Sequence, residues 1–402
     1  MQQQMMFIYT FKHWLQKYGE IKFEMKQLIY LDNNATTKVD PRVLDVMLPY
    51  FSEQYGNASS KLHAMGWVAE GAVDKARAQV ASLIGAEPSE IVFTSGATES
   101  CNTAIKGIFK AYASKGNHII TVKTEHKAVL DTCLYLEENE KADITYLNVD
   151  KEGLIDLDEL RKAIKSTTIL IAIMAANNET GVIQPLEEIA DIAKSNKIIW
   201  FSDATQFAGK MHCDVNELGM DVLALSAHKF HGPKGIGALY LRRKDPRVNI
   251  IPLLHGGAQE NGKRAGTLNV PLIAGLGQAA ELAKKEFWDN NTYTSKLRGY
   301  FEHQVLDLEG LSINGSTKTR LYNTSNITFP KGFDLIPELL KNFAFSSGSA
   351  CSSGTTEPSH VLAAMGLSEE EIKRSYRFSF SKFNTLEEVE MLVAQIFNRK
   401  EH

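Results

Sequence analysis

The chain has 402 residues, of which 44% are hydrophobic and 23% are charged, and its formal net charge at pH 7 is −4. This length exceeds what one small core requires and predicts a large domain with a smaller companion, while the composition is typical of a globular protein. The slightly acidic balance, without a cluster of Lys and Arg, excludes nucleic acid as a partner. The lack of a long apolar run excludes a membrane-spanning helix.

The N-terminal segment and the cysteines give three further expectations. Residues 1–24 lack the basic start and apolar run of a signal peptide, and we expect them to be an extension upstream of the natural start. Residues 25–40 are expected to form an arm that packs on the small domain. The four cysteines are widely spaced and suggest no disulfide framework, so a cytoplasmic, reducing compartment is expected: Cys101, Cys133, Cys213 and Cys351.

Short apolar runs alternate with helical patterns through the middle of the chain. Strands are predicted over 90–94, 118–122, 169–174, 198–202, 222–226 and 237–241, and helices over 100–114, from 126 onward and over 273–287. Repeated strand–helix units predict an α/β domain with a mostly parallel sheet. From about residue 271 the pattern changes to a mixed α+β tail.

The segment from Thr94 to Ser100 lies between a predicted strand and a predicted helix. Its backbone N–H groups and hydroxyls suit a phosphate at a helix N-terminus. The segment matches no Walker or dinucleotide fingerprint, and a capping box fits the same residues.

His126 and Asp203 both follow predicted strands. A ring at His126 can lie against a flat cofactor or take part in proton transfer, although a surface histidine fits the same position. A carboxylate at Asp203 suits the ring nitrogen of a pyridine cofactor, and it suits a helix N-cap equally well.

Two cationic side chains follow later in the chain. Lys229 comes after strand 222–226, where a lysine packs poorly. It can bind a cofactor aldehyde covalently, although escape to solvent is the commoner fate of a lysine at a strand end. Arg377 lies in an alternating strand, where it can clamp a substrate carboxylate with two nitrogens or simply be exposed.

Cys351 stands in a run of small polar residues, 345–357, that offers no apolar face. Gly348 and Gly354 flank it and loosen the backbone, whereas structural cysteines normally sit in apolar patterns. We therefore expect a reactive thiol on a movable loop, and a surface loop with an incidental cysteine fits this stretch taken alone.

Taken together, these residues resemble those of the cysteine desulfurases, pyridoxal-phosphate enzymes of the class V aminotransferase fold, from about Ile29 to about Leu392. The motifs that carry the resemblance occur in the family's order: 30–37, 93–100, 123–129, 177–181, 203–206, 226–229, 264–267, 346–351 and 377–379. The resemblance implies a PLP-dependent transferase fold. It comprises a large domain over 41–285, with a mostly parallel sheet of the seven-stranded type, and a smaller α+β domain over 286–402.

The resemblance also implies roles for the matching positions. Lys229 holds the cofactor covalently, Asp203 binds its ring nitrogen and Gln206 its ring hydroxyl oxygen. His126 stacks on the ring and assists catalysis. The remaining cofactor contacts, mostly to the phosphate, come from Ala97, Thr98, Ser226 and His228. Thr267 reaches the phosphate of a partner subunit, which implies a homodimer. Asn178 contacts the cofactor and, with Arg377, the substrate carboxylate.

The implied reaction removes sulfur from L-cysteine, giving L-alanine and a persulfide on Cys351, the nucleophile. Pyridoxal 5'-phosphate is the implied cofactor, and no metal site is expected. The long Ser/Gly-rich loop is similar to that of the branch that supplies iron–sulfur cluster assembly. A sulfur acceptor or an iron–sulfur scaffold protein is therefore the further partner. A selenocysteine lyase or a related PLP aminotransferase is the alternative, although an aminotransferase does not need Cys351.

Overall fold

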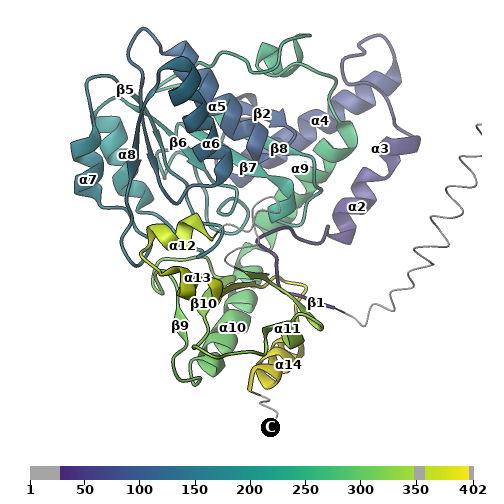
Figure 1. Ribbon diagram of the computed structural model, residues 1–402. Helices are drawn as coiled ribbons and strands as arrows, with labels where there is room; N and C mark the ends of the chain where they lie inside the picture. The colour runs from purple at the N-terminus through teal and green to yellow at the C-terminus, as the bar shows by residue number, and fades with distance from the viewer. Residues whose placement is uncertain (1–27, 348–357, 398–402) are drawn as a thin grey trace, which may run out of the picture.

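A seven-stranded sheet forms the centre of the protein in the computed structural model, which describes residues 28–347 and 358–397 (Figure 1). The expected extension over 1–24 and Cys351 lie outside these ranges. The strand order is β2-β8-β7-β6-β5-β3-β4, and all neighbours pair in parallel except β8, which runs antiparallel to β2 and β7. The prediction of a mostly parallel sheet is thus confirmed. The strands are β2 (Ile91–Thr94), β3 (His118–Val122), β4 (Asp143–Leu147), β5 (Thr168–Ala172), β6 (Ile199–Asp203), β7 (Val222–Ser226) and β8 (Gly237–Leu241).

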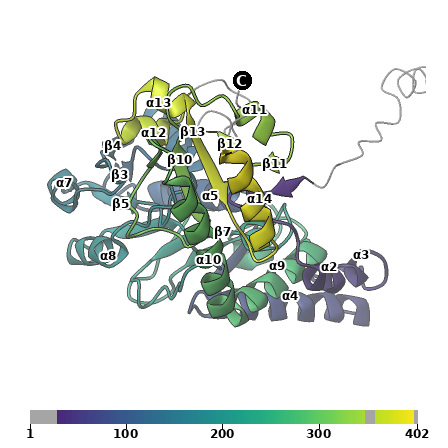
Figure 2. The same ribbon diagram turned by 90° about the horizontal axis from the view of Figure 1, so that it is seen from below.

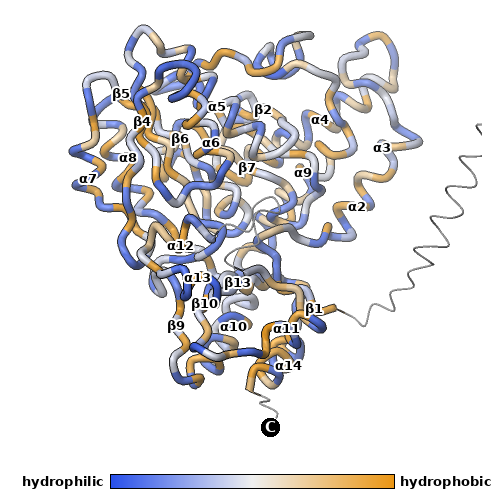
Figure 3. Tube along the Cα trace, in the orientation of Figure 1, coloured by the Kyte–Doolittle hydropathy of each residue, from blue (hydrophilic) through white to orange (hydrophobic). Residues whose placement is uncertain are grey.

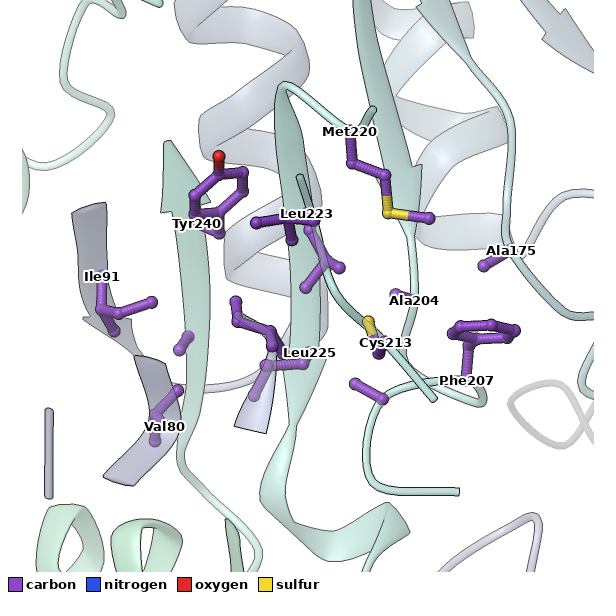
Figure 4. Close-up of a cluster of buried hydrophobic side chains, with 14 of the residues drawn as sticks. Val80, Ile91, Ala175, Ala204, Phe207, Cys213, Met220, Leu223, Leu225 and Tyr240 are labelled. Carbon is purple, nitrogen blue, oxygen red and sulfur yellow. The ribbon is translucent and has the colours of Figure 1, made fainter. Parts of the chain in front are cut away.

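Helices cover both faces of this sheet because successive strand residues point to opposite sides. In β6, Trp200 belongs to one buried cluster, whereas Ile199 and Phe201 belong to the other. The cluster of Trp200 packs under α4 (Ala64–Leu83), α7 (Leu157–Ala163), α8 (Leu186–Ser195) and α9 (Val270–Lys285); part of it is shown in Figure 4. The opposite cluster packs under α5 (Ala97–Ala111) and α6 (Lys127–Glu140). Figure 3 shows the apolar colour along the central strands.

A second, antiparallel sheet lies beside the first (Figure 2). Its order is β12-β13-β10-β9, from β9 (Ser312–Ile313), β10 (Thr324–Thr328), β12 (Ser346–Ser347) and β13 (Ser375–Ser379). Phe301, Phe378 and Leu392 form its core with neighbouring apolar side chains. The helices of this region are α10 (Phe287–Val305), α11 (Ile336–Leu339), α12 (His360–Ala364), α13 (Glu369–Lys373) and α14 (Leu386–Phe397).

The segment before residue 41 contacts both sheets. Strand β1 (Ile29–Tyr30) pairs in parallel with β11 (Phe343–Ala344) in a separate two-stranded sheet, and the Ser379 N–H of β13 donates to the Leu31 carbonyl at 2.7 Å. A few residues later the Thr37 N–H donates to the His228 carbonyl at 2.9 Å, next to the large sheet. Two short helices follow, α2 (Pro41–Met47) and α3 (Pro49–Ser52). The domain boundaries at 41 and 286 stay a prediction.

One helix start and one strand differ from the sequence-based expectation, and the helices α4, α7 and α8 were not among those predicted. The helix predicted over 100–114 begins earlier, as α5 at Ala97, because Gly96 rather than a hydroxyl residue is its N-cap. Strand β4 was not predicted, since it is only half-buried along most of its length and its apolar alternation is weak. No helix within residues 28–347 and 358–397 is long and apolar enough to cross a membrane.

Trp200 tests how much the core of the large sheet contributes to stability. Its side chain is fully buried in the strand that ends at Asp203. Trp200→Ala is expected to lower the free energy of unfolding by about 3–5 kcal/mol, because it removes a large buried surface and leaves a cavity. Urea unfolding measures the change. Trp288→Ala, at a tryptophan that is 77% exposed, is the control, with an expected change within roughly 0.5 kcal/mol. Equal losses of unfolding free energy in the two variants would contradict the placement of Trp200 in the core.

Candidate active site

A cavity of about 630 Å³ lies at the carboxyl ends of the parallel strands. Open α/β sheets bind ligands at this edge, because the loops that follow the strands converge there. The cavity wall also includes Ser346 and Arg377 from the antiparallel sheet and Asn34 from the N-terminal arm. Side chains from three separate parts of the chain therefore meet around one space.

One end of the cavity is the N-terminus of α5. Gly96, the N-cap, has a φ of 153°, and none of the described side chains caps this 15-residue helix. The first N–H groups of α5 therefore face the cavity, and the positive end of the helix dipole lies there too. Ser226, at the end of β7, lies 3.8 Å from the position that a Cβ on Gly96 would take. This end of the cavity suits an anion.

Glu99, in the first turn of α5, lines the same cavity and is paired with a cation. Its carboxylate accepts hydrogen bonds from the Ser95 N–H at 2.7 Å and from the Arg264 Nε at 2.8 Å. Although burial acts to raise it, these bonds hold the pKa of Glu99 below its usual value. Because Glu99 is paired with a cation, it does not cancel the positive field of the helix N-terminus.

Lys229 ends the short 3₁₀ turn 227–229 that follows β7. Its Nζ donates to the backbone carbonyls of Asn34 at 2.7 Å and Ala35 at 2.9 Å. The neighbouring His228 faces the same arm through Nδ1, 3.1 Å from the Thr36 hydroxyl. Desolvation, followed by the charges of Lys229 and nearby lysines, lowers the pKa of His228 to about 4. His228 is therefore neutral at pH 7.

Asp203 and His126 lie on the same cavity. Asp203 ends β6, is buried, and accepts the Thr205 N–H at 3.0 Å. His126 is the N-cap of α6, where its Nδ1 accepts the Ala128 N–H at 3.0 Å, so the proton of the neutral ring is on Nε2. Desolvation lowers the pKa of His126. The cavity thus holds a carboxylate and a neutral imidazole of fixed tautomer.

Arg377 lies at the side of the cavity formed by the antiparallel sheet. Its Nη2 donates to Asp32 Oδ1 at 2.6 Å and to the Ser346 hydroxyl at 3.0 Å, and its Nη1 donates to the Asn178 carbonyl at 2.8 Å. The guanidinium is almost fully buried and is held in one orientation by residues of the arm, both sheets and their loops. Such a fixed fork suits a ligand carboxylate.

The structure brings most of the predicted site residues to this cavity. Those on its wall are Ala97, Thr98, His126, Asn178, Asp203, Gln206, Ser226, His228, Lys229 and Arg377. Thr267 is exposed and does not line it. Cys351 lies outside the described residues.

Sequence reasoning assigned no role to Asp32 and Asn34, which also line the cavity. Both belong to the motif 30–37, which was used only for the family resemblance. The signal that could have identified them is a polar run directly after a strand.

The described residues on either side of segment 348–357 are bound next to the cavity. Ser346, before it, donates to Asp32 Oδ1 at 2.9 Å. Ser359, after it, donates to Glu179 Oε2 at 2.5 Å, and His360 Nε2 lies 2.9 Å from the Glu125 carbonyl, one residue before His126. Both attachment points of the segment that contains Cys351 are therefore close to the site.

Comparison with known proteins gives one consistent result. The family model described as Aminotransferase class-V matches residues 29–392. The chain is 48% identical to a mitosomal cysteine desulfurase of Encephalitozoon cuniculi, over 90% of this chain and 84% of that protein. It is also 48% identical to the mitochondrial cysteine desulfurase of Saccharomyces cerevisiae, with 92% and 74% covered. A third relative, cysteine desulfurase IscS of an Anaeromyxobacter strain, is 48% identical with 93% of each chain covered.

Solved structures agree with these relatives. A NifS-like protein superposes with a TM-score of 0.85 at 40% identity, covering 92% of this chain and 98% of its own. A structure described as SspA in complex with cysteine superposes with a TM-score of 0.80 at 39% identity, covering 89% and 100%.

The lowered pKa of His228 predicts a loss of stability in mild acid. With a pKa of about 4 in the folded chain, against about 6.5 when unfolded, the unfolded state binds more protons between these values. With respect to His228, the free energy of unfolding is therefore highest above about pH 6.5 and falls as the pH drops toward 4. Between pH 7 and pH 5, His228→Gln is expected to lose about 2 kcal/mol less free energy of unfolding than the parent chain.

Urea unfolding at the two pH values measures this difference. The exposed His303 provides the control, since His303→Gln should lose as much stability as the parent. An identical acid response in the parent and His228→Gln would show that His228 is not held neutral by the fold.

Proposed function

Since the chain belongs to the class V aminotransferase family and is a pyridoxal-phosphate-dependent cysteine desulfurase, we propose that the cavity at the carboxyl edge of the large sheet is its active site. One observation carries this assignment. A lysine, a buried carboxylate, an uncapped helix N-terminus and a fixed guanidinium all face one space of about 630 Å³: Lys229, Asp203, Gly96–Thr98 and Arg377.

The cavity fits pyridoxal 5'-phosphate by its own chemistry. The uncapped start of α5, with the hydroxyl of Ser226 beside it, suits the phosphate. The hydroxyl of Thr205, on the same wall, is buried without a hydrogen-bond partner among the described residues, so it is available to a ligand. When bound, the cofactor withdraws electrons from the α-carbon of an amino acid substrate.

Each side of the cofactor is assigned to separate residues. Asp203 would bind the ring nitrogen and keep it protonated, because a buried carboxylate favours a nearby positive charge. Gln206 would bind the ring hydroxyl oxygen, His126 would stack on the ring and Lys229 would hold the aldehyde carbon. The phosphate and nearby contacts come from Ala97, Thr98, Ser226 and His228. Thr267, which is exposed, reaches the phosphate of a partner subunit.

Arg377 and Asn178 orient the carboxylate of L-cysteine. The guanidinium is already aligned by Asp32 and by the Asn178 carbonyl, so little side-chain entropy remains to be lost on binding. With the cofactor bound, the Lys229 amine would serve as the base for the proton on the α-carbon of the substrate. Nζ already lies among polar backbone groups of Asn34 and Ala35, which can hold it as an ammonium.

Cys351 accepts the sulfur atom. Its thiolate attacks the sulfur of bound L-cysteine, a sulfur–sulfur bond forms and the carbon–sulfur bond breaks, so that L-alanine leaves and Cys351 carries a persulfide. No external oxidant is needed, because the α-amino acid retains the electrons of the broken bond. The binding of Ser346 and of Ser359–His360 near the cavity supports this assignment, since these residues flank the segment with Cys351.

The persulfide sulfur passes to an acceptor, and we assign the chain to iron–sulfur cluster assembly, with a scaffold protein as one acceptor. Relatives named IscS, at 48% identity, support this proposal.

We also propose a reducing compartment, the cytoplasm, because Cys101, Cys133 and Cys213 are free thiols in the described structure. Relatives described as mitosomal and mitochondrial make an organelle the alternative outcome of a localisation experiment.

A second copy of the chain completes the site. The region from α2 to the start of α4 carries large apolar side chains that are exposed in one chain: Leu48, Phe51, Tyr55, Leu62 and Trp67. Ile251, Leu253 and Leu254, which precede Thr267 in the chain, are exposed too. Exposed apolar side chains gathered in this way are typical of a protein interface. A homodimer covers them and lets Thr267 enter the partner's cavity.

Cys351 and Lys229 separate sulfur transfer from cofactor binding. After incubation with L-cysteine, intact-mass analysis of the parent holoenzyme is expected to show a gain of one sulfur atom. Cys351→Ala should keep the visible absorbance of the bound cofactor but gain no sulfur, and sulfide release should fall to background. Lys229→Ala should lose the visible band as well. Full sulfide release by Cys351→Ala would rule out its role as nucleophile.

The dimer assignment is tested by sedimentation at micromolar concentration. The parent chain of 44.7 kDa is expected to sediment at twice that mass. The double variant Phe51→Glu/Trp67→Glu should sediment as a monomer, because charges replace apolar contacts, and should hold the cofactor less tightly. The control Trp288→Glu changes an exposed tryptophan on α10 and should remain dimeric. A monomeric parent that holds its cofactor firmly would contradict the shared site.

A further inference from the structure

Lys210 is buried next to the cavity although no catalytic role has been assigned to it. It lies between β6 and β7, directly after Gly209, which has a φ of 78°, and only 5% of Lys210 is exposed. Lysine is rarely buried without an anionic partner. Both hydrogen bonds of its ammonium go to amide oxygens, Gln206 Oε1 at 2.7 Å and Asn34 Oδ1 at 3.0 Å. Within the described residues no carboxylate pairs with it.

The surroundings of Lys210 are cationic. Desolvation, followed by the charges of Lys229 and Arg377, lowers its pKa well below the usual value. His228 and His231 also lie close enough to respond to its charge. Such a position opposes folding, because a buried cation here meets like charges and no carboxylate. An apolar side chain of similar length would satisfy packing at lower cost, so packing does not explain the lysine.

The two hydrogen bonds have a geometric consequence for Gln206. An ammonium only donates, so the oxygen of the Gln206 amide must face Lys210, and its NH₂ group must face elsewhere. That group donates to the Asn34 carbonyl at 2.9 Å. Asn34 is held independently, since its Oδ1 also accepts from Asn323 Nδ2 at 3.1 Å. The orientation of the Gln206 amide is therefore set at both ends, by Lys210 on its oxygen and by the Asn34 carbonyl on its NH₂ group.

We propose that Lys210 is a positioning residue for the cofactor: it fixes the amide of Gln206 with its donor side toward the ring oxygen and places positive charge behind that amide. The inference rests on the proposed function, in which Gln206 binds the ring oxygen. A donor whose own oxygen accepts a bond from a cation is polarised and donates more strongly. Negative charge on the ring oxygen is stabilised in this way without direct contact with Lys210.

The test measures cofactor binding to the apoprotein, independently of turnover. Lys210→Met is expected to raise the dissociation constant of pyridoxal 5'-phosphate by about tenfold, the loss expected for one charge-assisted hydrogen bond. The visible band of the bound cofactor should shift in wavelength, since it reports the electron distribution of the ring. The melting temperature of the apoprotein should stay equal or rise, because an unpaired buried charge is removed. Lys75→Met, at an exposed lysine on α4, is the matched control and should change neither binding nor band.

A double-mutant cycle tests whether Lys210 acts through Gln206. In a Gln206→Ala background, Lys210→Met should cause no further loss of affinity, because the amide that it orients is gone. Lys210→Gln, which retains a neutral donor, should give an intermediate affinity. It replaces Lys210→Met in the binding measurement if that variant does not fold. Fully additive losses in the cycle, or a Lys210→Met protein that binds like Lys75→Met, would overturn the proposal. If Gln206→Ala and Asp203→Ala bind the cofactor normally, the proposed function itself fails.

Discussion

The site depends on one short contact set, in which residues 32–36 of the N-terminal arm bind both sides of the cavity. The Asn34 carbonyl accepts from Lys229 and from Gln206, so it joins two loops of the large sheet. Two residues earlier, Asp32 pairs with Arg377 of the antiparallel sheet. The arm thereby fixes the distance between the cofactor side and the carboxylate side of the cavity. Neither side would hold its orientation if these polar groups faced water.

The charges around the cavity explain its choice of ligand. Lys229, Lys210 and Arg377 lie near one another, and desolvation, followed by the charges of the lysines, holds His228 neutral. The acidic side chains nearby are largely committed: Glu99 to Arg264 and Asp32 to Arg377. A ligand with a phosphate and a carboxylate adds negative groups to this cationic cavity. Asp203 is the exception, and a protonated ring nitrogen is the cation that suits it.

Stability and function conflict at several of these positions. Burying Lys210 without a carboxylate, keeping His228 neutral and leaving α5 without a side-chain cap each oppose folding. The apolar clusters on the two faces of the sheet offset these losses, with Trp200 and Phe201 packed fully on opposite sides of β6. Stability is thus concentrated along the strands, and the polar groups whose burial opposes folding lie at their carboxyl ends.

The sequence by itself determined the parallel sheet, because apolar strands and polar strand ends are local patterns that follow the period of the backbone. It also determined which residue types stand at those ends, including Asp203 and Lys229. Only the tertiary structure decided that Asp32 holds Arg377, a pair separated by 345 residues, and that Lys210 faces Gln206 rather than solvent. It likewise decided that α5 begins at Ala97, behind an uncapped Gly96. The Asp32–Arg377 pair has no local signal, since it is set by packing between distant segments. Lys210 and Gln206 are only four residues apart, but their burial beside Asn34 of the arm depends on the tertiary fold.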